Sequence, residues 1–172
     1  MTAVIPSPWP DAEMLRFQET FIYGPEAFLV DEVLSADAEA KVLEATFDTT
    51  RPLPISAAQR GDPARHPRHV SGPELMLATG SLGCLHAFFF HGCHWDAGWV
   101  GFGSRVHRID FREIAYIGPP LHLRSEETRT RVGPKRVMLR LAFSFSQGGR
   151  EVYRGDQSAL FVHEPTFEAP GA

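Results

Sequence analysis

Two histidines stand just ahead of an uncharged apolar stretch, where an imidazole could take part in proton transfer. His66 and His69 lie in RHPRHVSGPEL, residues 65–75, and Ser71 and Glu74 follow within five residues of His69. An imidazole has a pKa near neutrality and suits general base chemistry. A carboxyl group can activate water, attack a carbonyl or, when protonated, act as an acid. We predict His69 as the base and Glu74 as its partner, with His66 as the less favoured histidine.

A helix is predicted to begin directly after these histidines. Ser71 and Glu74 form a capping-box pattern, with Gly72 and Pro73 in the first turn. Residues 75–90 are apolar on nearly every side, which is typical of a buried helix. Its free N-terminal N–H groups would stabilise negative charge on an oxygen, so Ser71 and Gly72 are predicted oxyanion or substrate contacts. Glu74 could equally act only as a helix cap, and the two roles are compatible.

Two glycines inside the predicted helix have a second possible role. Gly80 and Gly83 lie among small residues at spacings of three and four. Each costs about 1 kcal/mol in a helix interior, which suggests that a backbone or a ligand comes very close. We predict that they line a substrate slot, with simple helix packing as the alternative.

The elements around this helix predict an α+β fold. Two strands are expected before the helix and four after it, at 27–35, 41–50, 100–111, 121–132, 136–147 and 150–163. The Pro-rich stretch 51–70 reads as a long loop. An antiparallel sheet wrapped around one long buried helix satisfies this order. The chain divides into an irregular arm at 1–26 with one helical turn near 11–17, one domain at 27–163 and a tail at 164–172.

Composition narrows the function classes. The chain has 172 residues, suited to one domain, and a formal net charge of −4, which disfavours nucleic acid as a partner. Two cysteines make no disulfide framework and fit a cytoplasmic setting, and we expect neither a signal peptide nor a membrane span. The cluster HGCHWD, residues 91–96, matches no strong zinc spacing, so we predict a turn there, with no metal and no cofactor.

The order of elements resembles the hotdog fold. FLVDEVLS at 28–35, GFGSRVHRIDFREIAYIGPPL at 101–121 and REVYRGDQSALFV at 150–162 resemble strands of β-hydroxyacyl-[acyl-carrier-protein] dehydratases. The resemblance spans about residues 25–163. It implies a homodimer or dimer-based oligomer that acts on an acyl thioester carried by coenzyme A or acyl carrier protein. The resulting hypothesis is a 3-hydroxyacyl thioester dehydratase, a lyase of fatty-acid or polyketide assembly.

Departures from that family keep two alternatives open. The family's helix acid lies about fourteen residues after its histidine, where this chain has Gly80 and Gly83, or at Leu77 if the glycines are matched. RHVSGPEL also resembles a pattern of hotdog long-chain acyl-CoA thioesterases, in which a histidine is soon followed by glutamate. An acyl-thioester hydrolase and a non-catalytic acyl-binding subunit therefore remain possible. Arginines that could meet the phosphates of coenzyme A or an acidic carrier protein are Arg105, Arg108, Arg112 and, with Lys135, Arg136.

Overall fold

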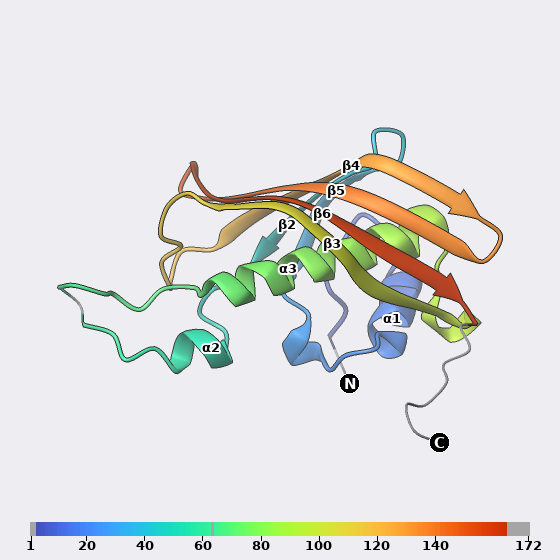
Figure 1. The fold of residues 1–172 in the computed structure, drawn as a ribbon. Helices are drawn as coiled ribbons and strands as arrows, with labels where there is room; N and C mark the ends of the chain where they lie inside the picture. Colours follow the sequence, from blue (N-terminus) through green and yellow to red (C-terminus); the bar gives the residue numbers. More distant parts are fainter. Residues whose placement is uncertain (1–2, 63, 165–172) are drawn as a thin grey trace, which may run out of the picture.

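The protein is one curved antiparallel sheet laid over a long helix (Figure 1). The computed structural model describes residues 3–62 and 64–164. The strands are β1 (Glu32–Asp37), β2 (Val42–Phe47), β3 (Trp99–Phe111), β4 (Leu121–Gly133), β5 (Arg136–Gln147) and β6 (Arg150–His163). Their order in the sheet is β1-β2-β4-β5-β6-β3, and each neighbouring pair is antiparallel. The predicted fold class and central helix are confirmed.

Two glycines explain why β5 and β6 form a tight hairpin. Gly148 and Gly149 both have positive φ, 57° and 79°, in the turn that joins β5 to β6. Glycine adopts this conformation without steric cost, and paired positive φ values match the twist of a tight hairpin. Strand β5 alternates buried and outward residues along its length, so one face of the sheet packs on the helix and the other faces outward.

The central helix has two parts. Helix α3 (Gly72–Leu85) is followed directly by one π-helical turn at His86–Phe90. The sequence analysis predicted a regular helix through residue 90 and did not anticipate this change of pitch. The inward-facing residues of the central helix join those of the sheet in one apolar core. The largest fully buried members of this core include Leu82 and Leu85 of the helix and Phe47, Phe145 and Tyr153 of the strands.

The central helix is buried along most of its length, but one stripe of it is exposed in the single chain. Met76 and Leu77 are 38% and 40% exposed, and Gly80 is also exposed. The sheet covers one side of α3, and the N-terminal segment covers part of the other. An apolar stripe along the first half of the helix is therefore left open in the single chain.

The N-terminal segment is more ordered than predicted. The expected single turn is a helix, α1 (Asp11–Thr20), which lies on the far side of α3 from the sheet (Figure 1). Met14 and Phe17 are fully buried, and Trp9 stacks on Phe89 with ring centroids 3.7 Å apart. Arg16 adds a bidentate bond to Asp96. The arm thus contributes side chains to the core.

Three other element boundaries differ from the predictions. The first strand was expected at 27–35, but a 3₁₀ turn occupies Pro25–Ala27 and β1 starts at Glu32. Phe28, Leu29 and Val30 are buried, so their apolar run reflects packing rather than strand pairing. Strand β2 is shorter than predicted, and the loop at 51–70 contains a short helix, α2 (Pro54–Ala57). The predicted tail is described only at residue 164, and residues 165–172 lie outside the described range.

Candidate functional site

The first turn of α3 is built by Glu74. Its carboxylate accepts hydrogen bonds from the backbone N–H groups of Ile55 and Ser56 in α2, at 3.0 and 3.2 Å, and from the Ser56 hydroxyl. It also accepts from the backbone N–H and the hydroxyl of Ser71, at 3.3 and 2.8 Å. The predicted capping box is therefore present, and the same carboxylate clasps α2 to α3.

These bonds set the protonation of Glu74. Burial alone would raise its pKa, but the hydrogen bonds from Ser56 and Ser71 outweigh burial and lower the pKa. The side chain is 3% exposed. Among the described residues no hydrogen bond joins Glu74 to His69, so the predicted acid–base pair is not in contact. Ser71 is also buried, and its hydroxyl donates a hydrogen bond to Glu74.

His69 lies just before α3, in a backbone segment that is fixed by hydrogen bonds. Its N–H and carbonyl both bond the side chain of Gln59, at 3.2 and 2.8 Å, and it forms a bridge with Tyr116. Its ring Nδ1 is 2.9 Å from the carbonyl oxygen of Pro67. A carbonyl oxygen only accepts, so Nδ1 carries a proton, and the tautomer of the uncharged imidazole that fits this bond has its lone pair on Nε2.

A hollow of about 490 Å³ joins His69 to the helix start. Gly72, Leu75 and Phe111 also line it. The Gly72 N–H bonds no described residue, whereas those of Glu74 and Leu75 bond the Ser71 carbonyl. A side chain at Gly72 would place its Cβ 2.9 Å from the tip of the Phe111 ring, so the ring would have to shift to make room for it. The structure thus brings His69 and Gly72 to one hollow.

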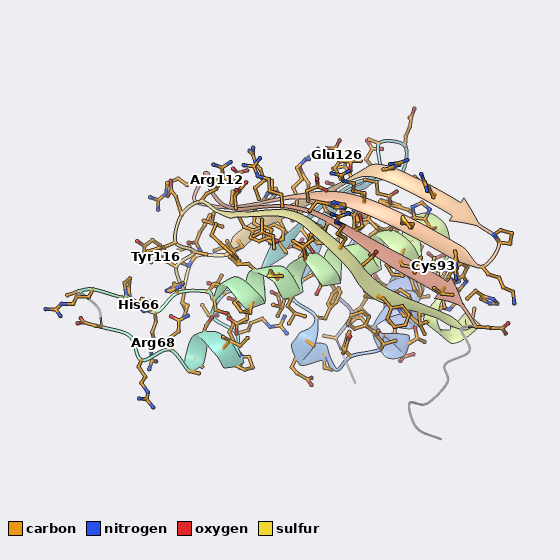
Figure 2. All side chains as sticks on the ribbon, viewed as in Figure 1. His66, Arg68, Cys93, Arg112, Tyr116 and Glu126 are labelled. Carbon is orange, nitrogen blue, oxygen red and sulfur yellow. The ribbon has the colours of Figure 1, made fainter. Side chains whose placement is uncertain are left out.

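His66 lies farther out. It is exposed, and its ring centroid is 5.1 Å from that of His69. Figure 2 shows His66 in the loop that extends from the start of α3, with Tyr116 and Arg112 at the same end of the molecule. Arg112 lines the same hollow as His69, and His66 does not.

A second hollow runs along the open stripe of α3. It has a volume of about 240 Å³ and lies between the helix and the inner sides of β3, β5 and β6. Gly80 and Gly83 line it from the helix, and Gly101 and Gly103 from β3. A Cβ at Gly80 or Gly103 would meet nothing within 4 Å, so these glycines leave open space. We call this feature the apolar groove. Its lining is mainly apolar and includes Met76, Leu77, Phe102 and Phe161.

Comparison with solved structures supports the architecture. A hypothetical thioesterase protein with coenzyme A from Streptococcus pneumoniae TIGR4 is 12% identical, with a TM-score of 0.53 over 78% of this chain and 88% of that one. The HP0420-homologue from Helicobacter felis is 11% identical, with a TM-score of 0.54 over 86% and 87%. Streptococcus mutans smu.793 bound to acetyl CoA is 10% identical, with a TM-score of 0.52 over 78% and 90%.

The chain has the hotdog fold. No protein-family model matches it, and no curated protein sequence does. The predicted resemblance to the hotdog fold is confirmed, and the likeness to dehydratases in particular is not shown. Within the described residues no helix is both long and apolar enough to cross a membrane.

The opposite end of the hotdog helix carries a polar cluster that sequence reasoning missed. His86 is fully buried, and its Nδ1 is 2.9 Å from the Glu127 carboxylate of β4. Its Nε2 is 2.9 Å from the Ser125 hydroxyl. The Nε2 of His91 is 2.9 Å from both oxygens of the same carboxylate, and the Thr130 hydroxyl donates to it at 2.7 Å.

The π-helical turn explains this arrangement. Residues five apart lie on different sides of an α-helix with 3.6 residues per turn, but nearly in line where the turn is wider. The turn at His86–Phe90 therefore lets His86 and His91 reach one carboxylate. The signal in the sequence was a histidine inside an apolar run, together with an acid on an inward strand position.

The same contacts fix the charges of the cluster. Burial opposes ionisation of Glu127, but the bonds from His86, His91 and Thr130 outweigh it and lower the pKa to about 2. Burial lowers the pKa of His86, which is therefore neutral. The ionised Glu127 carboxylate is therefore buried and bonded by both histidines.

The remaining reactive side chains have other partners. In HGCHWD, His91 bonds Glu127, His94 packs against Phe88, and Asp96 pairs with Arg16. Among the described residues no group of three histidine, cysteine or acidic side chains could hold a metal ion. Burial raises the pKa of Cys84 and of Cys93 to about 12, so neither thiol is activated.

Proposed function

We propose that this hotdog protein hydrolyses acyl thioesters. The apolar groove takes the acyl chain, and the carbonyl lies at the first turn of α3. The observation that carries this proposal is His69, whose Nδ1 is held by the Pro67 carbonyl while its ring lines the hollow beside Gly72. This tautomer leaves Nε2 as a base next to the free N–H of Gly72.

The proposed reaction needs these two groups and a water molecule. Nε2 of His69 takes a proton from the water, whose oxygen attacks the thioester carbonyl. The oxygen that becomes negative is stabilised by the Gly72 N–H and the helix dipole. The carbon–sulfur bond then breaks, and the imidazolium returns the proton to the departing thiolate. The products are a carboxylic acid and a thiol. Glu74 positions the helix start and does not touch the substrate.

The choice of hydrolysis over dehydration rests on the same geometry. Dehydration needs a second group that protonates the leaving C3 hydroxyl. The family's acid position corresponds to Leu77, or to Gly80 and Gly83, and Glu74 is ionised and occupied by Ser56 and Ser71. Among the described residues α3 carries no other acid. The dehydratase hypothesis thus lacks a placed acid.

The solved neighbours support an acyl thioester as substrate class. One neighbour is called a thioesterase protein and holds coenzyme A, and another is bound to acetyl CoA. An acyl carrier protein as the thiol carrier stays a prediction from the sequence resemblance, as does a cytoplasmic location.

A homodimer is part of the proposal. Strand β3 is an edge strand of thirteen residues that pairs with β6 on one side. Phe102, Val106 and Phe111 on it are 44%, 50% and 56% exposed. An exposed long apolar edge is a site for pairing with another chain. Pairing two copies here would cover the open stripe of α3 and close the apolar groove. Light scattering after size exclusion should give about twice the 19.1 kDa chain mass.

The test of activity uses purified protein and two substrate sets. Acyl-CoA thioesters of graded chain length are followed by free thiol, and 3-hydroxyacyl thioesters by 2-enoyl product. We expect thiol release, lowered roughly 10²–10⁴-fold in kcat by H69A. H66A is the matched control and should stay within about twofold. Enoyl formation without thiol would replace this proposal by dehydration. Acyl binding without either product would leave a non-catalytic subunit.

The groove is tested by Gly80→Leu. A Cβ at this position would meet no atom within 4 Å, and the residue lines the apolar groove. We expect a normal fold, a raised KM for long acyl chains and little change for acetyl-CoA. An equal effect on all chain lengths would contradict the placement of the acyl chain.

A further inference from the structure

The outer face of the sheet, opposite to α3, is hollowed and lined by arginines from four strands. The hollow has a volume of about 530 Å³. The arginines that line it are Arg108 of β3, Arg124 and Arg129 of β4, Arg140 of β5 and Arg154 of β6. Asp156 is the acidic residue in the lining, and small residues such as Ala142, Ser144 and Gly155 form the floor. Figure 2 shows Glu126, which lies between Arg124 and Arg129 in β4, on the side of the sheet away from the helix.

The backbone pairing places like charges together. Arg129 is the direct partner of Arg140 across the β4–β5 ladder. Like charges in directly opposite positions destabilise a sheet. The register shift between Glu127 and Arg129 sends Glu127 inward to the histidine cluster and Arg129 outward beside Arg140. A bound anion would relieve this repulsion.

Neighbouring acids orient most of these arginines and leave one uncompensated. Asp156 holds Arg140 by two bonds at 2.8 and 2.5 Å. Asp110, Glu126 and Glu151 pair with the arginines at positions 108, 124 and 154. Arg129 has no acidic partner among the described residues. A second hollow of about 170 Å³ also contains Arg129 and Arg140 and adds Arg131 and His107. The two hollows therefore form one continuous row of arginines along the outer face, which we call the strip.

The size of the strip indicates the kind of anion. Adjacent strands lie about 4.8 Å apart, so the four strands from β4 to β3 span roughly 14 Å. One phosphate cannot contact arginines over that width, whereas a chain of phosphates can. The guanidinium fork binds phosphate oxygens in pairs. The lining offers no exposed aromatic ring for stacking a base, since Phe143 is buried.

We propose that this hollow binds a small ligand with two or more linked phosphate groups, recognised through its phosphate chain. The site is on the opposite face of the sheet from the apolar groove, and it does not depend on the proposed hydrolase activity.

The test is calorimetric titration of the full chain with sodium tripolyphosphate, pyrophosphate and orthophosphate at low salt. We expect affinity to rise with each added phosphate and to fall steeply as salt is raised. ATP and tripolyphosphate should bind with similar affinity, because the phosphate chain carries recognition.

Matched variants locate the binding. R129Q removes an exposed cation without breaking an ion pair and should weaken tripolyphosphate binding at least tenfold. R68Q changes net charge equally, but lies in the loop below the helix (Figure 2), and should bind as the wild type does. Circular dichroism and the melting temperature check that both variants fold. Equal weakening in both variants, no preference for longer phosphate chains, or no binding of any probe would overturn the proposal.

Discussion

The two ends of α3 each carry histidine and glutamate, yet they use them in opposite ways. At the N-terminal end Glu74 is occupied by α2 and the helix cap, and His69 bonds only the Pro67 carbonyl through its ring. At the C-terminal end Glu127 of β4 holds both His86 and His91. The difference teaches that a histidine is available for chemistry where the fold leaves one ring nitrogen unused beside a hollow.

Removing the carboxylate at the C-terminal end should have the largest effect on stability. Glu127→Ala leaves two histidines and the Thr130 hydroxyl without their shared partner. We expect the free energy of unfolding to fall by about 3–5 kcal/mol in urea denaturation. The matched control is Glu126→Ala, because Glu126 pairs with Arg124 on the outer surface and such pairs contribute about 0–1 kcal/mol. Equal losses in the two variants would contradict the buried cluster.

Acid should release much of the same stabilisation in the wild-type chain. The pKa of Glu127 is lowered from 4.5 to about 2, so its contribution is present above about pH 4.5 and is lost as the pH falls toward 2. The pKa of His86 is also lowered from 6.5, so the unfolded chain gains this proton first as the pH falls below 6.5. Both shifts make stability rise with pH in this range. Urea midpoints measured from pH 7 to pH 3 should decline less steeply in Glu127→Ala.

At the N-terminal end, loss of the carboxylate should cost less. Glu74→Ala removes the cap of α3 and its link to α2, and we expect a loss of about 1–3 kcal/mol. Glu13→Ala is the matched control, since Glu13 has the same position in the first turn of α1 and no side-chain hydrogen bond among the described residues. Conservative Glu74→Gln should recover part of the loss. If the Glu74 carboxylate destabilised the start of the helix, Glu74→Ala and Glu74→Gln would both be more stable than the wild type.

The smallest effect on stability is expected for the histidine proposed as base. His69→Ala removes a partly exposed ring with one local hydrogen bond, so the free energy of unfolding should change by no more than about 0.5 kcal/mol. A large loss of stability in this variant would mean that His69 serves to stabilise the folded structure. Comparing the free energies of unfolding of His69→Ala and Glu127→Ala therefore distinguishes the two ends of the helix most sharply.

Local patterns predicted the fold better than they predicted the partners of polar side chains. The alternation in β5, the Gly148–Gly149 turn and the Ser71–Glu74 cap all depend on neighbours in the chain, and all are present. The bounds of β1 were wrong because Phe28–Val30 is buried by packing outside the strand ladder.

The candidate site could be predicted only where its contacts are local. His69, Gly72 and the glycines of the helix could be singled out because they lie on or beside one element, and their roles stay predictions. The separation of His69 from Glu74 depends on Ser56, which donates from the loop that was predicted to be irregular. The pairing of His86 with Glu127 depends on a π-helical turn and on a distant strand, which no single stretch of sequence reveals.

The position of β3 in the sheet has a consequence for synthesis on the ribosome. This strand leaves the exit tunnel well before β6, which is its partner in the sheet and is about 40 residues farther along the chain. Until β6 emerges, the nascent chain exposes an unpaired strand, and contacts between segments so far apart in sequence form slowly. Chains released early, before residue 150, would keep that strand unpaired, and a chaperone that shields β3 during translation should raise the yield of folded protein.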